Sequence, residues 1–141
     1  MERKASAVWQ GGLKDGKGTL TTESKALSGT PYSFGTRFEG TPGTNPEELL
    51  AAAHAGCFSM ALSLILGESG IRPERIDTTA TVTLEKLDTG FAITKVHLDV
   101  SVRAPGADRA KVVESAAKAK AGCVLSKVLK ADISMDAKLV A

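Results

Sequence analysis

One unbroken apolar segment constrains this chain more than any other feature. Residues 49–66 read LLAAAHAGCFSMALSLIL, with one histidine and two serines as the only polar side chains. The segment has a clear helical start, because Asn45 suits the N-cap, Pro46 suits the first helical position, and two glutamates then lie at the positive end of the helix dipole. These signals predict a helix over 46–66 that ends before the glycines at 67 or 70.

A helix this apolar has two possible environments. Eighteen mostly apolar residues are long enough to span a bilayer. The flanks, however, lack the aromatic and basic anchors that are typical of a membrane span, and the rest of the chain has the pattern of an ordinary α+β domain. We therefore expect a buried central helix and no membrane partner.

Alternating apolar and polar residues predict strands over 5–10, 19–24, 32–40, 77–87, 91–102 and 133–140. Shorter helical segments are expected over 108–120 and 125–130, with Gly122 as the interruption and Cys123 at the break. A change of parity within 91–102 predicts a β-bulge near Thr94. The whole chain, 1–141, is expected to form a single α+β domain.

Composition narrows the function classes. The 141 residues include 18 Lys and Arg against 16 Asp and Glu, a net charge of +2, and only one Trp, one Tyr and four Phe. This is neither the basic surface nor the set of stacking aromatics that nucleic-acid binding requires. The N-terminal residues are polar and glycine-rich, unlike a signal peptide. We expect a cytoplasmic protein with no nucleic-acid partner.

The two cysteines, Cys57 and Cys123, are the main candidates for chemistry. A permanent disulfide is disfavoured in the cytosol, so they are either two inert thiols or a redox couple. Cys57 lies within the apolar helix, where a small buried hydrophobe is as plausible as a nucleophile. Cys123 follows a glycine and begins a helical segment, where unpaired N–H groups favour a thiolate, although a buried cap residue is the alternative.

The two histidines are weaker candidates. His54 lies one turn before Cys57, and the two could be a nucleophile and its base, or together join Cys123 and a glutamate in a zinc site. No CxxC or HxxxH spacing supports the metal, so a core-lining or polar-bridging role is favoured. His97 is expected on the solvent face of its strand.

A cation and a carboxylate complete the candidate set. Arg37 is predicted on the small-residue face of strand 32–40, where it could hold a nearby thiol as thiolate; the alternative is a solvated arginine paired with Glu39. Glu47 lies about 80° from Cys57 around the helix, whereas Glu48 lies about 180° away. Glu47 is therefore the better candidate, and Glu48 fits a role at the helix dipole.

Four segments together resemble one known family: PYSFGTRFEG, GTNPEELLAAAHAGCFSMALSLILGESG, IDTTATVTLEKLDTGFAITKVHL and AKAGCVLSKVLKADI. They are similar to the OsmC branch of the OsmC/Ohr family, over nearly the whole chain. The resemblance implies an OsmC/Ohr-like fold, with antiparallel sheets wrapped around two central helices in an intertwined homodimer. It also implies a thiol-dependent peroxidase acting on organic hydroperoxides and hydrogen peroxide, with no metal, flavin or haem cofactor.

The resemblance also implies residue roles. Cys57 corresponds to the peroxidatic cysteine, Cys123 to the resolving cysteine, Arg37 to the arginine that activates Cys57, and Glu47 to its salt-bridge partner. A small-molecule peroxide and an external dithiol, such as a lipoyl-bearing protein, are the expected partners. Val124 departs from the proline that relatives often carry there. The main alternative is a redox-sensing or binding protein of the same fold without turnover; a domain with two inert thiols is a third.

The predicted helix also bears on assembly. Ten residues of straight helix separate Glu47 from Cys57 by about 15 Å along the axis. Either the helix breaks near Gly56, or Arg37 and Glu47 of one subunit serve Cys57 of the other. A helix that is apolar all round also needs cover on both sides, whereas one sheet of about six strands covers only one. We favour a homodimer with residues of both chains at each site.

Overall fold

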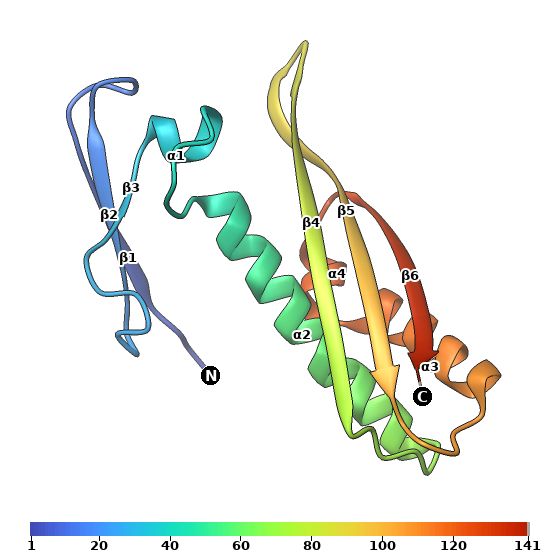
Figure 1. The fold of residues 1–141 in the computed structure, drawn as a ribbon. Helices are drawn as coiled ribbons and strands as arrows, with labels where there is room; N and C mark the ends of the chain where they lie inside the picture. Colours follow the sequence, from blue (N-terminus) through green and yellow to red (C-terminus); the bar gives the residue numbers. More distant parts are fainter. Residues whose placement is uncertain (141) are drawn as a thin grey trace. The chain divides into compact units, whose positions relative to one another are not determined.

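The computed structural model describes residues 1–140, which divide into two compact units: residues 1–49, and the chain from Leu50 onward. The first unit holds an antiparallel sheet of order β1-β2-β3, formed by β1 (Ala5–Gln10), β2 (Lys17–Thr22) and β3 (Thr30–Tyr32) (Figure 1). Trp9 packs against Tyr32 with ring centroids 5.5 Å apart. Gly18 lies between the two rings, where a Cβ atom would come within 2.5 Å of Tyr32, so only glycine fits there.

The predicted strand over 32–40 is wrong beyond its first residue. The chain turns at Ser33 into the short helix α1 (Phe34–Phe38). A capping box explains the turn: the Ser33 hydroxyl accepts a hydrogen bond from the backbone N–H of Thr36, and the Ser33 N–H donates to the Thr36 hydroxyl. Phe34 and Phe38, four residues apart, pack with centroids 4.9 Å apart, as helical spacing allows.

The long apolar helix is α2 (Pro46–Glu68), two residues longer than predicted and unbroken at Gly56. The predicted N-cap is confirmed, because Asn45 Oδ1 accepts the backbone N–H of Glu48 at 2.8 Å. Gly70, with φ +75°, ends the helix, and the N–H of Ile71 donates back to the carbonyl of Leu66 at 2.9 Å.

Among the described residues of the second unit, one face of α2 is covered. The buried residues are spaced four apart: His54, Phe58, Leu62 and Leu66. Met60 and Leu64, on the opposite side, are 78% and 66% exposed. By length and hydropathy alone α2 could cross a membrane, but its covered face forms part of the core of the second unit, as in a folded domain.

The second unit is built on a mixed three-stranded sheet, β4 (Arg75–Leu87), β5 (Gly90–Arg103) and β6 (Asp132–Val140) (Figure 1). Opposite Thr83 and Leu84 of β4 lie Lys95 and Ile93 of β5, so Thr94 is the extra residue and the predicted bulge is confirmed. The α+β class is confirmed too. Two details differ from expectation: β6 pairs with β5 in parallel, and the strands form two separate sheets.

Helices α3 (Arg109–Gly122) and α4 (Val124–Val128) complete the second unit. Asp108 caps α3, accepting backbone N–H bonds from the first helical turn. Alternate residues of β5 join one face of α2 and one of α3 in a single core, whose larger members are Phe58, Leu62, Leu66, Val96, Leu98, Val100, Val102 and Val112. Cys123 both ends α3 and caps α4, so the break predicted at Gly122 and Cys123 is confirmed.

Candidate active site

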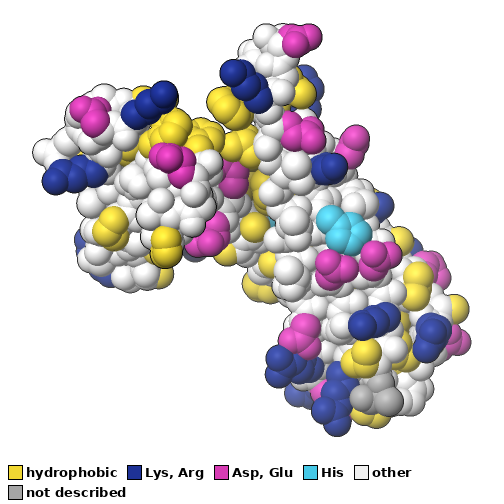
Figure 2. All heavy atoms as spheres, turned by 45° about the horizontal axis from the view of Figure 1, so that its top comes forward, with side chains coloured by type: hydrophobic (Ala, Val, Ile, Leu, Met, Phe, Trp, Pro, Cys, Tyr) yellow, Lys and Arg dark blue, Asp and Glu magenta, His cyan; other side chains and the backbone are white. Residues whose placement is uncertain are grey.

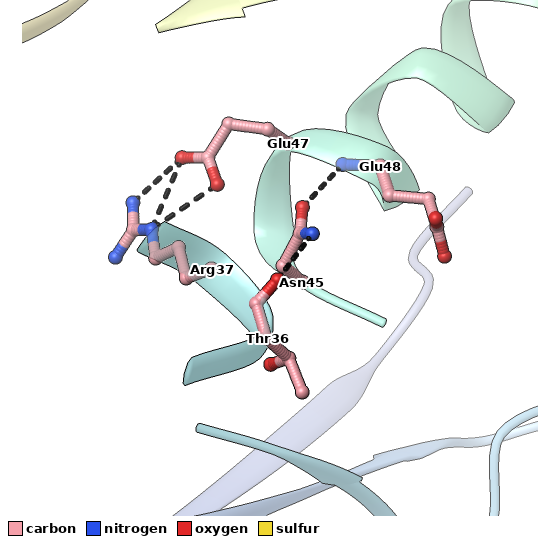
Figure 3. A network of polar contacts seen from close by, with 5 residues as sticks. All are labelled: Thr36, Arg37, Asn45, Glu47 and Glu48. Atoms are coloured by element: carbon pink, nitrogen blue, oxygen red, sulfur yellow. Dashed lines mark hydrogen bonds and ion pairs between the residues drawn. The ribbon is translucent and has the colours of Figure 1, made fainter. Parts of the chain in front are cut away.

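An ion pair fixes the guanidinium of Arg37 (Figure 3). Nη2 donates to Glu47 Oε1 at 2.7 Å, while Nε lies 3.2 and 3.1 Å from the two carboxylate oxygens. This two-pronged geometry is the strong form of an arginine–carboxylate pair. Arg37 thus lies on helix α1, not on a strand, and its partner is Glu47 instead of Glu39.

The elements around the pair hold both side chains in place. Asn45 links α1 to the start of α2, since its Nδ2 donates to the Thr36 carbonyl at 3.0 Å while its Oδ1 caps Glu48 (Figure 3). The Glu47 side chain is only 13% exposed, against 38% for Arg37. Within residues 1–140, Nη1 of Arg37 has no hydrogen-bond partner, so one edge of the guanidinium is available to a ligand.

An aromatic pocket of about 250 Å³ lies beside Arg37 within the first unit. Its wall includes Arg37 and Ser33 and is otherwise apolar, formed by Trp9, Leu13, Tyr32, Phe34 and Phe38. The sequence did not indicate this pocket, because it depends on α1 replacing the expected strand. The pocket combines an apolar wall with one fixed cation, which suits a ligand with an apolar body and a polar oxygen.

The two thiols differ in exposure. Both cysteines are free; Cys57 is half-buried, whereas Cys123 is only 2% exposed. Cys57 packs at the margin of the core of which Cys123 is a member. A small molecule arriving from solvent can therefore meet Cys57 before Cys123.

A buried polar chain reaches Cys123. The imidazole Nε2 of His54 lies 2.9 Å from the Ser126 hydroxyl, which in turn lies 3.3 Å from the sulfur of Cys123. Burial lowers the pKa of His54 below its ordinary value, so the ring is neutral at neutral pH. The polar-bridging role expected for His54 is confirmed. Ser126 was missed, although its position three residues after Cys123, at the start of a helix, was visible in the sequence.

His97 lies on β5 beside two acidic side chains, and Figure 2 shows a histidine next to acidic side chains on the surface. Its Nε2 is 3.4 Å from Asp99 and 3.2 Å from Asp136, and its Nδ1 is 2.6 Å from the Ser134 hydroxyl. Across residues 1–140 this is the one group of three potential metal-ligating side chains, and all are at least part-exposed. The candidate zinc ligands, His54 with the two cysteines and a glutamate, form no such group among the residues that the structure describes.

Solved structures with this fold define the class of protein. The crystal structure of the organic hydroperoxide resistance protein OhrB of Bacillus subtilis superposes with a TM-score of 0.71 at 27% identity, covering 96% of this chain and 98% of that one. The fold is therefore that of the OsmC/Ohr proteins.

Sequence comparison gives the family. The model of OsmC-like proteins matches residues 38–138. Peroxiredoxin OsmC of Escherichia coli is 57% identical over 139 residues, 99% of this chain and 97% of that protein. An organic hydroperoxide resistance protein of Xanthomonas axonopodis pv. citri is 30% identical over 123 residues, 84% of this chain and 83% of that protein. The chain belongs to the OsmC-like family.

Proposed function

We propose that this chain, a thiol-dependent peroxidase of the OsmC-like family, uses Cys57 as its peroxidatic residue and Cys123 as its resolving residue. The observation that carries the assignment is the difference in exposure: Cys57 is half-buried and Cys123 is buried. A peroxidatic thiol must meet a substrate from solvent, whereas a resolving thiol needs to meet only the oxidised cysteine.

The reaction has three steps. The Cys57 thiolate attacks one peroxide oxygen, the O–O bond breaks, and an alcohol or water leaves, with a sulfenic acid remaining on Cys57. The Cys123 thiol then displaces the sulfenic oxygen as water and forms an intramolecular disulfide. An external dithiol reduces that disulfide by exchange and is itself oxidised.

Arg37 serves the first step. A permanent cation favours the thiolate and stabilises the negative charge that develops on the leaving oxygen. The ion pair with Glu47 holds the guanidinium in one orientation and leaves Nη1 for the peroxide. Glu47 acts through Arg37, so its role is positioning.

The substrate class follows from the pocket beside Arg37. Aromatic walls around a single cation favour a hydroperoxide with an apolar body over hydrogen peroxide. The names of the relatives, which include organic hydroperoxide resistance proteins, agree with this preference. We expect both peroxides to be reduced, with cumene hydroperoxide reduced more efficiently than hydrogen peroxide.

The active unit is proposed to be a homodimer with residues of both chains at each site. The exposed face of α2 supports it, since Met60 and Leu64 need apolar cover that the second unit by itself does not supply. The other support is that α2 continues through Gly56, so the broken helix that was the alternative is absent. Mixing Cys57→Ser with Arg37→Ala protein should restore activity in heterodimers once subunit exchange is shown; no recovery would contradict the shared site.

The deciding experiment for turnover is a peroxidase assay in which tert-butyl, cumene and hydrogen peroxides are offered with several dithiols, dihydrolipoate and a lipoyl-bearing protein among them. Sustained consumption of the dithiol supports an enzyme of the reducing cytoplasm. Oxidation that stops after one equivalent of peroxide, with every donor, supports a redox sensor of the same fold instead.

A further inference from the structure

The second unit contains a buried titratable group that the steps above do not use. His54 is completely buried on α2, and its Nε2 lies 2.9 Å from the hydroxyl of Ser126 on α4. That hydroxyl is 3.3 Å from the sulfur of Cys123, and the backbone N–H of Ser126 donates to the same sulfur at 3.4 Å. The three side chains form a continuous hydrogen-bonded chain. Its link between His54 and Ser126 joins residues that are 72 positions apart in the sequence.

The charge of His54 follows from its burial. Burial lowers the pKa of His54. The imidazole is therefore neutral, and one of its ring nitrogens has a lone pair. The Nδ1 atom is buried without a partner among residues 1–140, so the hydrogen bond to Ser126 is the ring's single polar contact there. With the proton on Nδ1, Nε2 accepts from the Ser126 hydroxyl, whose oxygen can then accept the Cys123 S–H.

We propose that Ser126 and His54 form a proton relay for the resolving cysteine: Ser126 accepts the thiol proton of Cys123 as its own proton passes to His54 Nε2. This inference rests on the proposed function, because it assumes that Cys123 resolves a sulfenic acid on Cys57. Ser126 contacts the reacting sulfur and is a catalytic residue, whereas His54 acts through Ser126 and is a positioning residue.

The relay balances the chemistry of resolution. The S–H bond of Cys123 breaks, its sulfur forms the S–S bond, and the S–O bond of Cys57 breaks. Each sulfur changes by one electron, since that of Cys57 is reduced and that of Cys123 is oxidised. The sulfenic oxygen of Cys57 leaves with its own proton and takes a second proton, the one that Cys123 gave to the relay. One water is therefore released, and His54 ends neutral.

The relay matters because Cys123 is buried. A thiol only 2% exposed has little access to solvent hydroxide, so it needs an internal acceptor for its proton. A neutral buried imidazole suits this role, because at neutral pH its Nε2 atom keeps a lone pair that can accept a proton. Only Nε2 takes part in the transfer.

Rapid-quench mass spectrometry after one equivalent of cumene hydroperoxide tests the relay, because it follows the Cys57 sulfenic acid and the disulfide separately. Ser126→Ala and His54→Gln should form sulfenic acid within twofold of the wild-type rate, but resolve it about 100-fold more slowly, the low end for general acid–base catalysis. Ser126→Thr keeps the hydroxyl and should recover most of the rate.

The pH profile separates proton transfer from a structural hydrogen bond. Wild-type resolution should vary little between about pH 6.5 and 8, because the acceptor is already neutral there. In Ser126→Ala and His54→Gln the rate should rise with hydroxide across that range. The matched control is Ser59→Ala, which removes a hydroxyl of α2 that is bonded to the Ala55 carbonyl and the Thr78 hydroxyl, and should keep the wild-type profile.

The relay would be overturned if both Ser126→Ala and His54→Gln resolved the sulfenic acid at the wild-type rate and with the wild-type pH profile. Should Ser126→Ala not fold, a proton inventory on the wild-type protein decides: a curved dependence of the resolution rate on deuterium fraction supports two protons in motion, and a linear one contradicts it. If wild-type protein forms no sulfenic acid on Cys57, the proposed function fails instead, which this assay distinguishes.

Discussion

Replacing Glu47 by glutamine isolates the value of a fixed guanidinium, because Glu48 provides a matched control. Both residues lie in the first turn of α2, so each substitution removes one carboxylate from the helix dipole at a similar cost of about 0.3–1 kcal/mol in stability. Only Glu47 bonds to Arg37; at Glu48 the bond to Asn45 is made by the backbone N–H and survives the change. The difference between the variants therefore reports the ion pair alone.

The size of the effect can be worked from the contacts. A hydrogen bond to a charged group contributes about 1.5–3 kcal/mol and a neutral one about 0.5–1.5 kcal/mol, so each strong contact loses about 1 kcal/mol on neutralisation. Glu47 receives bonds from two nitrogens, and solvent screening at Arg37, 38% exposed, brings the total to about 1–2 kcal/mol. Since 1.36 kcal/mol corresponds to a tenfold change in rate, about 1–2 kcal/mol corresponds to about a 5- to 30-fold loss in kcat/KM.

The assay is kcat/KM for cumene hydroperoxide with a saturating dithiol, alongside thermal unfolding of each variant. Glu47→Gln should fall 5- to 30-fold, as about 1–2 kcal/mol implies, and Glu48→Gln should stay within about twofold of wild type. Equal losses in the two variants, at equal stability, would refute the role assigned to the Arg37–Glu47 pair.

Four further outcomes are expected. Cys57→Ser should abolish peroxide reduction, whereas Cys123→Ser should react once and then accumulate sulfenic or over-oxidised Cys57, as mass spectrometry would show; the reverse pattern would exchange the two roles. Arg37→Lys should lower kcat/KM about tenfold or more although the charge is kept, since a lysine has no planar fork to match the carboxylate. Because burial lowers the pKa of His54, the unfolded chain binds the proton more readily; stability is full above the ordinary value of 6.5 and falls as pH drops below it. Urea unfolding should show this loss of stability at low pH, and His54→Gln should make the stability less dependent on pH. Met60→Lys, on the uncovered face of α2, should shift sedimentation from dimer towards monomer; an unchanged dimer would place the interface elsewhere.

The long helix shows what the sequence predicts well. Asn45, Pro46 and Gly70 act through local backbone chemistry, so both ends of α2 were predictable to within about two residues. The bulge at Thr94 was predictable for a similar reason, because an extra residue reverses the parity of side chains along one strand.

The segment after Tyr32 shows where local pattern misleads. Phe34 and Phe38 are four residues apart, a spacing that alternation and a helical turn both allow. The deciding contact is the reciprocal bond between Ser33 and Thr36, a capping box without the usual glutamate or glutamine. Partners distant in sequence were out of reach in another way: no local signal joins His54 to Ser126, since their contact depends on the packing of α2 against α4.

The two units divide the chemistry between them. The ion pair of Arg37 and Glu47, with its aromatic pocket, lies wholly within residues 1–49. Both thiols and the polar chain from His54 lie in the second unit. In the proposed mechanism the first unit supplies the cation, whereas the second supplies the nucleophile and its resolving partner. The proposed mechanism requires Arg37 and Cys57 to act on one substrate. In the homodimer that we propose, the exposed face of α2 around Met60 and Leu64 meets a second copy of the chain, so that proposal makes dimerisation a condition of activity.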